Sequence, residues 1–179
     1  NVDSYHVCLC DDSWTKVSAV NISPSEVESK FGINLATANI QTIVGTSGDD
    51  YLVGGVGSDS IDGGDGADAL IGGAGFDTLI GGNDGDRLDG GQGDDIIDGG
   101  ADGQWGDIVD YRLSPSAVTV NLATGTASGG EGNDTLINIE HIYDSPYDDT
   151  LTGDNKDNVF KLNKGNDVVD GAGGYNLVW

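Results

Sequence analysis

The chain has 179 residues, of which 31 are acidic and only 7 are Lys or Arg, so its formal net charge is −24. A surface of this sign repels nucleic acid and anionic membranes, and the partners that it favours are cations. No run of about 18 apolar residues occurs, so we expect no membrane-spanning helix. Hydrophobic residues make up only 36% of the chain, a small share for a globular domain. We therefore expect folding to require neutralisation of the acidic side chains.

Residues 1–44 do not repeat, and they are predicted to form a small N-terminal α/β cap or an assembly segment. Residues 5–10 and 16–22 have the pattern of strands. Ser23-Pro24-Ser25-Glu26 has the features of a helix start, with Ser at the N-cap, Pro at the first helical position and Glu closing a capping box. Such a segment would cover the open end of a repetitive fold.

His6, Cys8 and Cys10 fall on one face of the first predicted strand. Three interpretations stay open for them: a strand with two small apolar thiols and a surface histidine, an intersubunit disulfide, or a zinc or copper site. A direct bridge between Cys8 and Cys10 would be strained across so short a loop.

From residue 45 the chain consists of six consecutive nine-residue units, which read GTSGDDYLV, GGVGSDSID, GGDGADALI, GGAGFDTLI, GGNDGDRLD and GGQGDDIID. The sixth position is always aspartate: Asp50, Asp59, Asp68, Asp77, Asp86 and Asp95. The eighth position is always Leu or Ile: Leu52, Ile61, Leu70, Leu79, Leu88 and Ile97. This strict period argues against a flexible acidic linker, so residues 45–110 are predicted to form the main block of a repetitive fold.

Each unit predicts a turn followed by a short strand. The first six residues are rich in Gly and Asp, which favour turns, and the last three form a strand whose middle residue points inward. Two units complete one coil, so each unit lies under the unit two places along the chain. In the fifth unit Asp84 stands where Gly is expected, and because Asp tolerates the left-handed region we expect a distorted turn there rather than a lost one.

The pattern weakens over residues 99–143. The unit from Gly99 carries about three extra residues before Asp107-Ile108-Val109. Residues 111–143 are predicted to be a strand-rich spacer, with strands at 117–122 and 136–142 joined by a Gly-rich return at 124–132. His141 lies in the second of these strands, and without a visible nucleophile partner a surface histidine is favoured over a catalytic base.

Residues 144–179 resume the period of nine as DSPYDDTLT, GDNKDNVFK, LNKGNDVVD and GAGGYNLVW. The sixth positions are Asp149, Asn158, Asp167 and Asn176, and the eighth positions are Leu151, Phe160, Val169 and Val178. This region is predicted to be a second, degenerate repeat block.

The stacking of alternate units places the sixth-position aspartates in two columns. Strands in a sheet lie about 4.8 Å apart, so Asp50, Asp68 and Asp86 would form one column and Asp59, Asp77 and Asp95 the other. Calcium prefers oxygen ligands at about 2.4 Å, so an ion fits between successive carboxylates, and turn carbonyls can complete its shell. Magnesium demands a stricter octahedron and fits such a turn poorly. The recurrence of the carboxylates marks them as repeated ligands rather than as a glycosidase pair.

The main block predicts about four full calcium sites, and the second block adds the pair Asp149 and Asp167. Asn158 and Asn176 offer neutral side-chain oxygens as ligands, so we expect their calcium site to be weaker or absent. The complete set of predicted calcium ligands is Asp50, Asp59, Asp68, Asp77, Asp86, Asp95, Asp107, Asp149, Asp167, Asn158 and Asn176.

The nonapeptide G-G-x-G-x-D-x-U-x resembles the repeat of the RTX (repeats-in-toxin) family of secreted bacterial proteins. The resemblance is tight over residues 45–98 and loose over 107–179, and the segment between the two blocks is similar to stretches that separate repeat blocks in that family. It implies a mostly β fold, a right-handed parallel β-roll that binds calcium, and secretion, often by a type I export system. Because this family includes enzymes, toxins, adhesins and surface-layer proteins, the fold alone does not fix the role.

Several outward-facing strand positions are apolar. Tyr51, Val53, Ala69 and Ile71 would stack on one face, and Ile80 and Ile96 on the other. They are either covered by the N-terminal segment or the 117–142 hairpin, or they contact another copy or another domain.

We expect a secreted, calcium-binding structural protein that self-assembles into a surface layer, fibre or matrix, and not an enzyme. The alternative is the C-terminal export and folding module of a larger RTX enzyme or toxin.

Overall fold

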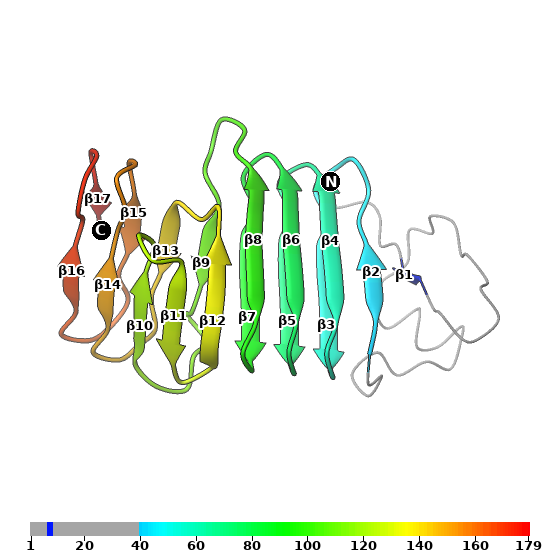
Figure 1. Cartoon of the computed structure of the whole chain (residues 1–179), viewed down its shortest axis with the longest axis horizontal. Coiled ribbons are helices and arrows are strands. Elements are labelled where there is room, and N and C mark those ends of the chain that lie inside the picture. Colours follow the sequence, from blue (N-terminus) through cyan, green and yellow to red (C-terminus); the bar gives the residue numbers. More distant parts are fainter. Residues whose placement is uncertain (1–6, 9–39) are drawn as a thin grey trace.

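A computed structural model describes residues 7–8 and 40–179 of the chain (Figure 1). The predicted N-terminal α/β cap, including the expected helix and the side chains of His6, Cys8 and Cys10, lies outside the described residues. Of this region the structure gives strand β1 (Val7–Cys8), which pairs antiparallel with β2 (Thr42–Val44). Within the described ranges the chain forms strands and turns without a helix, and no helix there is long and apolar enough to cross a membrane.

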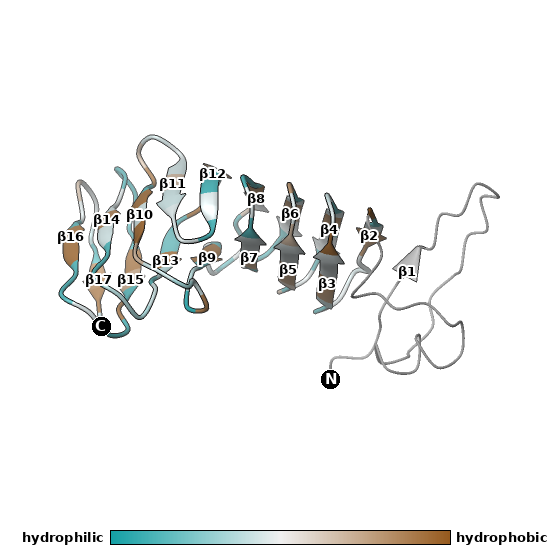
Figure 2. Cartoon of the chain, turned by 90° about the horizontal axis from the view of Figure 1, so that it is seen from below, coloured by the Kyte–Doolittle hydropathy of each residue, from teal (hydrophilic) through white to brown (hydrophobic). Residues whose placement is uncertain are grey.

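The main block winds as a parallel solenoid in which successive strands alternate between two sheets. Residues eighteen positions apart are paired: Tyr51 with Ala69, and Ala69 with Arg87. The two sheets face each other and run along the same axis (Figures 1 and 2). The strands of the main block after β2 are β3 (Tyr51–Val56), β4 (Ser60–Asp65), β5 (Ala69–Ala74), β6 (Thr78–Asn83), β7 (Arg87–Gln92), β8 (Ile96–Ala101) and β9 (Ile108–Asp110).

The strands of the main block are longer than the sequence pattern predicted. Strands β3 to β8 each span six residues and continue through the paired glycines of the next unit, so the prediction of a six-residue turn and a three-residue strand was wrong there. The second glycine of each pair has a positive φ, 114° at Gly73, and a Cβ there would collide with the backbone of Gly55 in the neighbouring strand. Without side chains at these positions the backbones approach closely enough to extend the ladder.

The predicted core is confirmed. All six eighth-position residues of the main block are buried, with at most 2% of each side chain exposed. Ile43 precedes them in the same core, and the residues that continue it toward the C-terminus are Val109, Leu136, Ile142, Leu151 and Phe160. The fifth unit keeps its turn as expected: Asp84 adopts φ 75°, and Asp86 still accepts a hydrogen bond from the backbone of Asp68.

The segment 111–143 is incorporated into both sheets. It contributes β10 (Val118–Asn121), β11 (Thr126–Gly129), β12 (Gly132–Ile137) and β13 (His141–Tyr143). The predicted Gly-rich return therefore contains a strand, and the predicted strand 136–142 is divided between two sheets. Asn138, with φ 51°, lies where the chain changes sheet, and an apolar pattern alone does not reveal such a crossover.

The second block follows the predicted period of nine. Its strands are β14 (Thr150–Thr152), β15 (Val159–Lys161), β16 (Val168–Asp170) and β17 (Leu177–Val178). One sheet has ten strands in the order β1-β2-β4-β6-β8-β12-β11-β10-β14-β16. The other has seven, in the order β3-β5-β7-β9-β13-β15-β17. Within the described residues, both repeat blocks and the segment between them thus form one continuous all-β solenoid.

The outward apolar side chains of the main block are not covered by residues 117–142. Strands β10, β11 and β12 extend the ten-stranded sheet edge to edge instead of lying over either face. Tyr51, Val53, Ile80 and Ile96 are exposed, whereas Ala69 and Ile71 are half-buried. The prediction that a hairpin from this segment covers them was wrong, because its strands find backbone partners in the sheet.

Candidate metal centre

The sixth-position residues form two columns of stacked side chains, as predicted. The first column lies in the turns that lead into the seven-stranded sheet: the backbone N–H of Asp50 donates to Oδ1 of Asp68 (2.8 Å), and Asp68 donates in the same way to Asp86 (2.7 Å). The second column lies in the turns that lead into the ten-stranded sheet. There the N–H of Asp59 donates to Oδ1 of Asp77 (2.7 Å), and that of Asp77 to Asp95 (2.8 Å).

Each of these carboxylates keeps one buried oxygen without a hydrogen-bond partner. The atoms are Oδ1 of Asp50 and Oδ2 of Asp59, Asp68, Asp77, Asp86, Asp95 and Asp107. All seven residues are at most 3% exposed. A buried oxygen of a charged group is costly to leave unpaired, so a repeated row of such atoms indicates a missing positive partner.

The unpaired oxygens face small spaces that backbone carbonyls also line. A Cβ built on Gly72 would lie 2.5 Å from Oδ2 of Asp77 and 2.5 Å from the carbonyl oxygen of Gly90. The same arrangement recurs at Gly54, where the neighbours are Oδ2 of Asp59 and the carbonyl of Gly72. No side chain fits there. Carboxylate and carbonyl oxygens are the ligands that calcium prefers, so the residues present fit this ion.

The electrostatics of the columns indicate the same deficit of positive charge. Burial raises the pKa of Asp86, Asp95 and Asp107 to about 7, against an ordinary value of 3.8. Neighbouring carboxylates add to this increase in pKa, and the backbone N–H donor on each side chain opposes it. A cation in the column would hold these groups ionised at neutral pH.

A cluster of three carboxylates lies at the far end of the second column. Ligand atoms of Asp144, Asp149 and Asp167 all lie within 4.8 Å of one another. The backbone N–H of Asp149 donates to Oδ1 of Asp167 (3.0 Å), as the predicted pairing of these two residues requires. Asp144 is fully buried, and its Oδ2 has no hydrogen-bond partner. This group adds a third carboxylate to a site for which the sequence predicted two.

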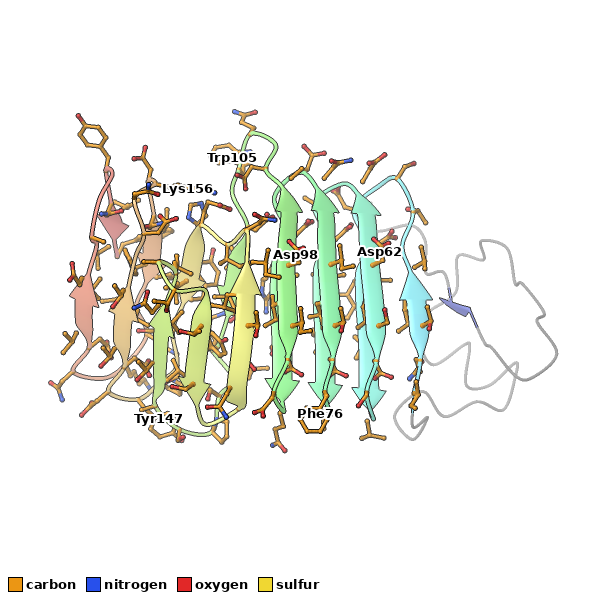
Figure 3. The ribbon with its side chains drawn as sticks, viewed as in Figure 1. Asp62, Phe76, Asp98, Trp105, Tyr147 and Lys156 are labelled. Carbon is orange, nitrogen blue, oxygen red and sulfur yellow. The ribbon has the colours of Figure 1, made fainter. Side chains whose placement is uncertain are left out.

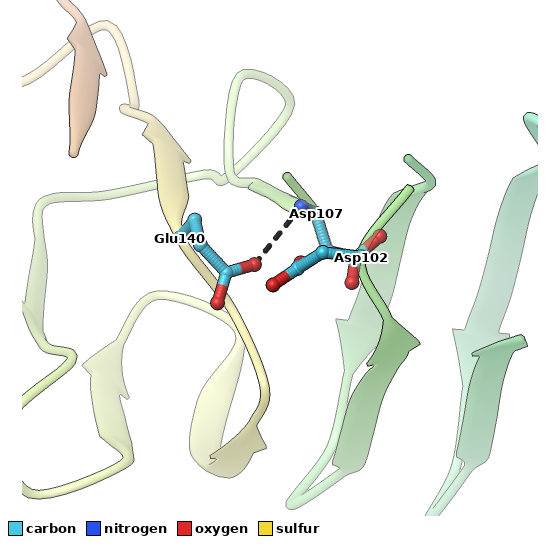
Figure 4. Close-up of side chains that lie close together, drawn as sticks. All are labelled: Asp102, Asp107 and Glu140. Carbon is cyan, nitrogen blue, oxygen red and sulfur yellow. Dashed lines mark hydrogen bonds between the residues drawn. The ribbon is translucent and has the colours of Figure 1, made fainter. Parts of the chain in front are cut away.

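A second cluster lies in the first column, where Asp107 meets Asp102 and Glu140 (Figure 4). Its ligand atoms also lie within 4.8 Å of one another. Asp102 comes from the loop with the extra residues after β8, and Glu140 precedes β13. The N–H of Asp107 donates to Oε2 of Glu140 (3.1 Å), so Glu140 continues the column after Asp107.

Asn158 and Asn176 occupy the column positions that the sequence assigned to them. The N–H of Asn158 donates to Oδ1 of Asn176 (2.9 Å). The side-chain amide of Asn158 donates to the carbonyl of Glu140 and to Asp154, and that of Asn176 donates to the carbonyls of Gly171 and Gly173. These amides therefore find partners within the protein, and the weaker or absent calcium site expected there stays a prediction. Their role as ligands, like that of the nine predicted aspartates, stays a prediction.

Four acidic residues of these sites were not predicted. Asp134 accepts the N–H of Asp95 (3.1 Å) and so extends the second column. Residues 129–137 read GGEGNDTLI, a complete repeat that identifies Asp134. Glu140 stands two residues before the buried Ile142, the spacing between sixth and eighth positions. The other two, Asp102 and Asp144, lie at positions that carry no repeat signal.

His141 has a structural contact. The backbone N–H of Val159 donates to its Nδ1 (3.1 Å) across the seven-stranded sheet, and the side chain is half-buried. This bond holds the ring against the neighbouring strand.

Comparison with known proteins matches the RTX calcium-binding nonapeptide repeat in four copies, at residues 44–79, 71–103, 125–137 and 143–178. The third copy includes the repeat around Asp134. No curated protein matches the chain. The four copies together cover more than half of the sequence and coincide with the stacked turns that carry the two columns. The chain belongs to the family of RTX calcium-binding nonapeptide repeat proteins.

Proposed function

We propose that this chain is a calcium-dependent structural protein, which folds when it meets extracellular calcium and then assembles with other copies of itself. RTX repeats are typical of secreted bacterial proteins, and the proposal places the chain outside the cell or at its surface. The observation that carries it is the double row of buried carboxylate oxygens without partners. These atoms make ion binding and folding a single process.

The energetic balance explains why folding needs the ion. Two carboxylates at the strand spacing repel by about 3 kcal/mol at an effective dielectric of 20, and the columns repeat this repulsion at successive turns. Against it, each unit of the main block buries only one large apolar side chain, in a chain that carries a net charge of −24. Calcium replaces each repulsion with two attractions and thereby links one coil to the next.

Exposed apolar residues on and beside the last strand, β17, support assembly. Tyr175 is 90% exposed, and Leu177 and Trp179 are 56% and 64% exposed. Strands β16 and β17 are edge strands of their sheets, and edge strands offer backbone groups to a further chain. We propose that the repeated acidic side chains serve as ligands and not as catalysts, and that the chain has no enzymatic activity of its own. The alternative is that it is the export and folding module of a larger RTX enzyme or toxin.

Sedimentation velocity at increasing protein concentration tests the assembly, with calcium and with chelator. We expect concentration-dependent association in calcium only. The double substitution Tyr175→Ser and Leu177→Ser should abolish association while leaving calcium binding unchanged. A matched control removes Phe76 and Leu113, an exposed aromatic and an exposed leucine elsewhere on the solenoid, and should associate as the wild type does. If the wild type stays a monomer in calcium, the export-module alternative replaces the structural role.

A further inference from the structure

Glu140 differs from the other acidic residues of the first column in the partners of its two oxygens. In Asp68, Asp86 and Asp107 the second carboxylate oxygen has no hydrogen-bond partner. In Glu140, Oε2 accepts the N–H of Asp107, and Oε1 accepts a hydrogen bond from the ammonium of Lys156. The oxygen that elsewhere in the column lacks a cation is here paired with a cation of the chain itself.

Two departures from the regular repeat bring this cation into place. Lys156 lies in the turn between β14 and β15, and its Nζ is also 4.0 Å from Oδ2 of Asp102. Asp102 is available because the loop after β8 carries extra residues. Figure 3 shows Lys156 and Trp105, which lies in that loop, at the same edge of the solenoid. The ammonium therefore contacts two members of a group of three carboxylates, and the third, Asp107, is fully buried with an unpaired oxygen.

The cluster at the end of the second column provides an internal comparison. Asp144, Asp149 and Asp167 are also three carboxylates with ligand atoms within 4.8 Å of one another. Among the described residues, none of these three forms an ion pair with a lysine or an arginine. Both clusters thus contain three carboxylates, and among the described residues only the first has an ammonium beside it.

We propose that the ammonium of Lys156 takes the place of a calcium ion at Glu140, so that the first column needs no ion at this level. The inference rests on the proposed calcium-dependent folding. Beyond Glu140 the first column continues with Asn158 and Asn176, whose amides are already bonded, so no further ion is required there. In the second block, calcium binding is then confined to the Asp144–Asp149–Asp167 cluster. The junction between the two blocks is held in one column by a lysine and in the other by calcium.

Counting bound calcium by equilibrium dialysis of the full chain at saturating ion tests this substitution. Lys156→Met leaves Glu140, Asp102 and Asp107 without their ammonium, and we expect it to bind one calcium ion more than the wild type. Adding Glu140→Gln to this variant should remove the extra ion. Lys164→Met makes the same change of charge at an exposed turn lysine that forms no ion pair among the described residues, and it should bind as many ions as the wild type. An unchanged or lower count in folded Lys156→Met would overturn the inference.

A second measurement uses the wild type and does not depend on the folding of a variant. In the calcium-saturated protein, the amine of Lys156 should be acylated several-fold more slowly than that of Lys164, because its pairing with Glu140 persists. Equal rates would mean that calcium displaces the ammonium, and the inference would be wrong. Failure of the proposed calcium-dependent folding has a different signature, since the wild type would then bind no calcium at all.

Discussion

At the scale of single residues, the six column aspartates from Asp59 to Asp107 each have two roles that use different oxygens. One oxygen accepts the N–H of the unit two places earlier and fixes the register of the coil. The other has no protein partner and is available to an ion. Asparagine preserves the first role and removes the second, so Asp→Asn substitutions separate register from ion binding.

Interior and edge positions of a column should differ in their calcium dependence. Asp68 has carboxylates of the column on both sides, whereas Asp50 lies at its start and has one oxygen bonded to the backbone and hydroxyl of Thr46. We expect Asp68→Asn to lose about 3 kcal/mol of calcium-induced stabilisation, the order lost when one partner of a buried ion pair is removed. Asp50→Asn should lose less of the calcium-induced stabilisation, because Asp50 has a column neighbour on one side only.

Chemical denaturation at fixed calcium measures these losses. Asp65→Asn is a control with the same charge change at an exposed side chain, and it should lose little. Equal losses for Asp50 and Asp68 would contradict the stacking of ions along the column.

The raised pKa values predict an unusual pH dependence for the calcium-free protein. Asp86, Asp95 and Asp107 have a pKa of about 7 in the fold and an ordinary value of 3.8, so the folded chain holds protons that the unfolded chain releases. Their contribution to stability is fully present below the unfolded value and is lost as pH rises through about 7. In calcium-depleted buffer the fold should therefore be more stable to heat at about pH 5 than at about pH 8, where we expect it to be largely lost.

Saturating calcium should reverse this dependence, because protons then compete with the ion for the same oxygens. Thermal unfolding followed by circular dichroism at both pH values, with and without calcium, measures the effect. If the thermal unfolding midpoint of the calcium-free protein rises with pH, the column carboxylates are not buried without a compensating charge.

At the scale of the strands, the period of nine predicted those features that depend only on a residue's position within its unit. It identified the buried eighth residues, the two columns and the continuation of the roll after Asp144, because each of these follows from stacking identical units. It did not predict that the strands extend through the paired glycines, since the same glycines are compatible with a turn.

The segment between the blocks was the least predictable. Residues 129–137 form a complete repeat, but it pairs with β8 across an interval of 39 residues instead of 18. Strands β10 and β11 enter the ten-stranded sheet between two parts of the repetitive fold, and local periodicity contains no information about such an insertion. For the same reason Asp102 and Lys156 could not be assigned to one site: their proximity depends on an irregular loop and a degenerate unit.

At the scale of the whole molecule, the acidic charge and the small core together weaken the fold of the calcium-free chain. A chain of net charge −24 with one large buried apolar side chain per unit lacks the stabilisation to fold while its columns are bare. The same columns, filled with ions, connect every coil to the next. In the proposed extracellular role, passage from a calcium-poor to a calcium-rich compartment sets the time and place of folding.

Small-angle scattering together with far-ultraviolet circular dichroism, in chelator and in millimolar calcium, distinguishes calcium-dependent folding from folding without the ion. We expect an expanded chain with little β signal in chelator at neutral pH, which becomes compact and gains the β signal on adding calcium. A compact chain with its full β signal in chelator would contradict it, because the paired columns would then be stable without an ion.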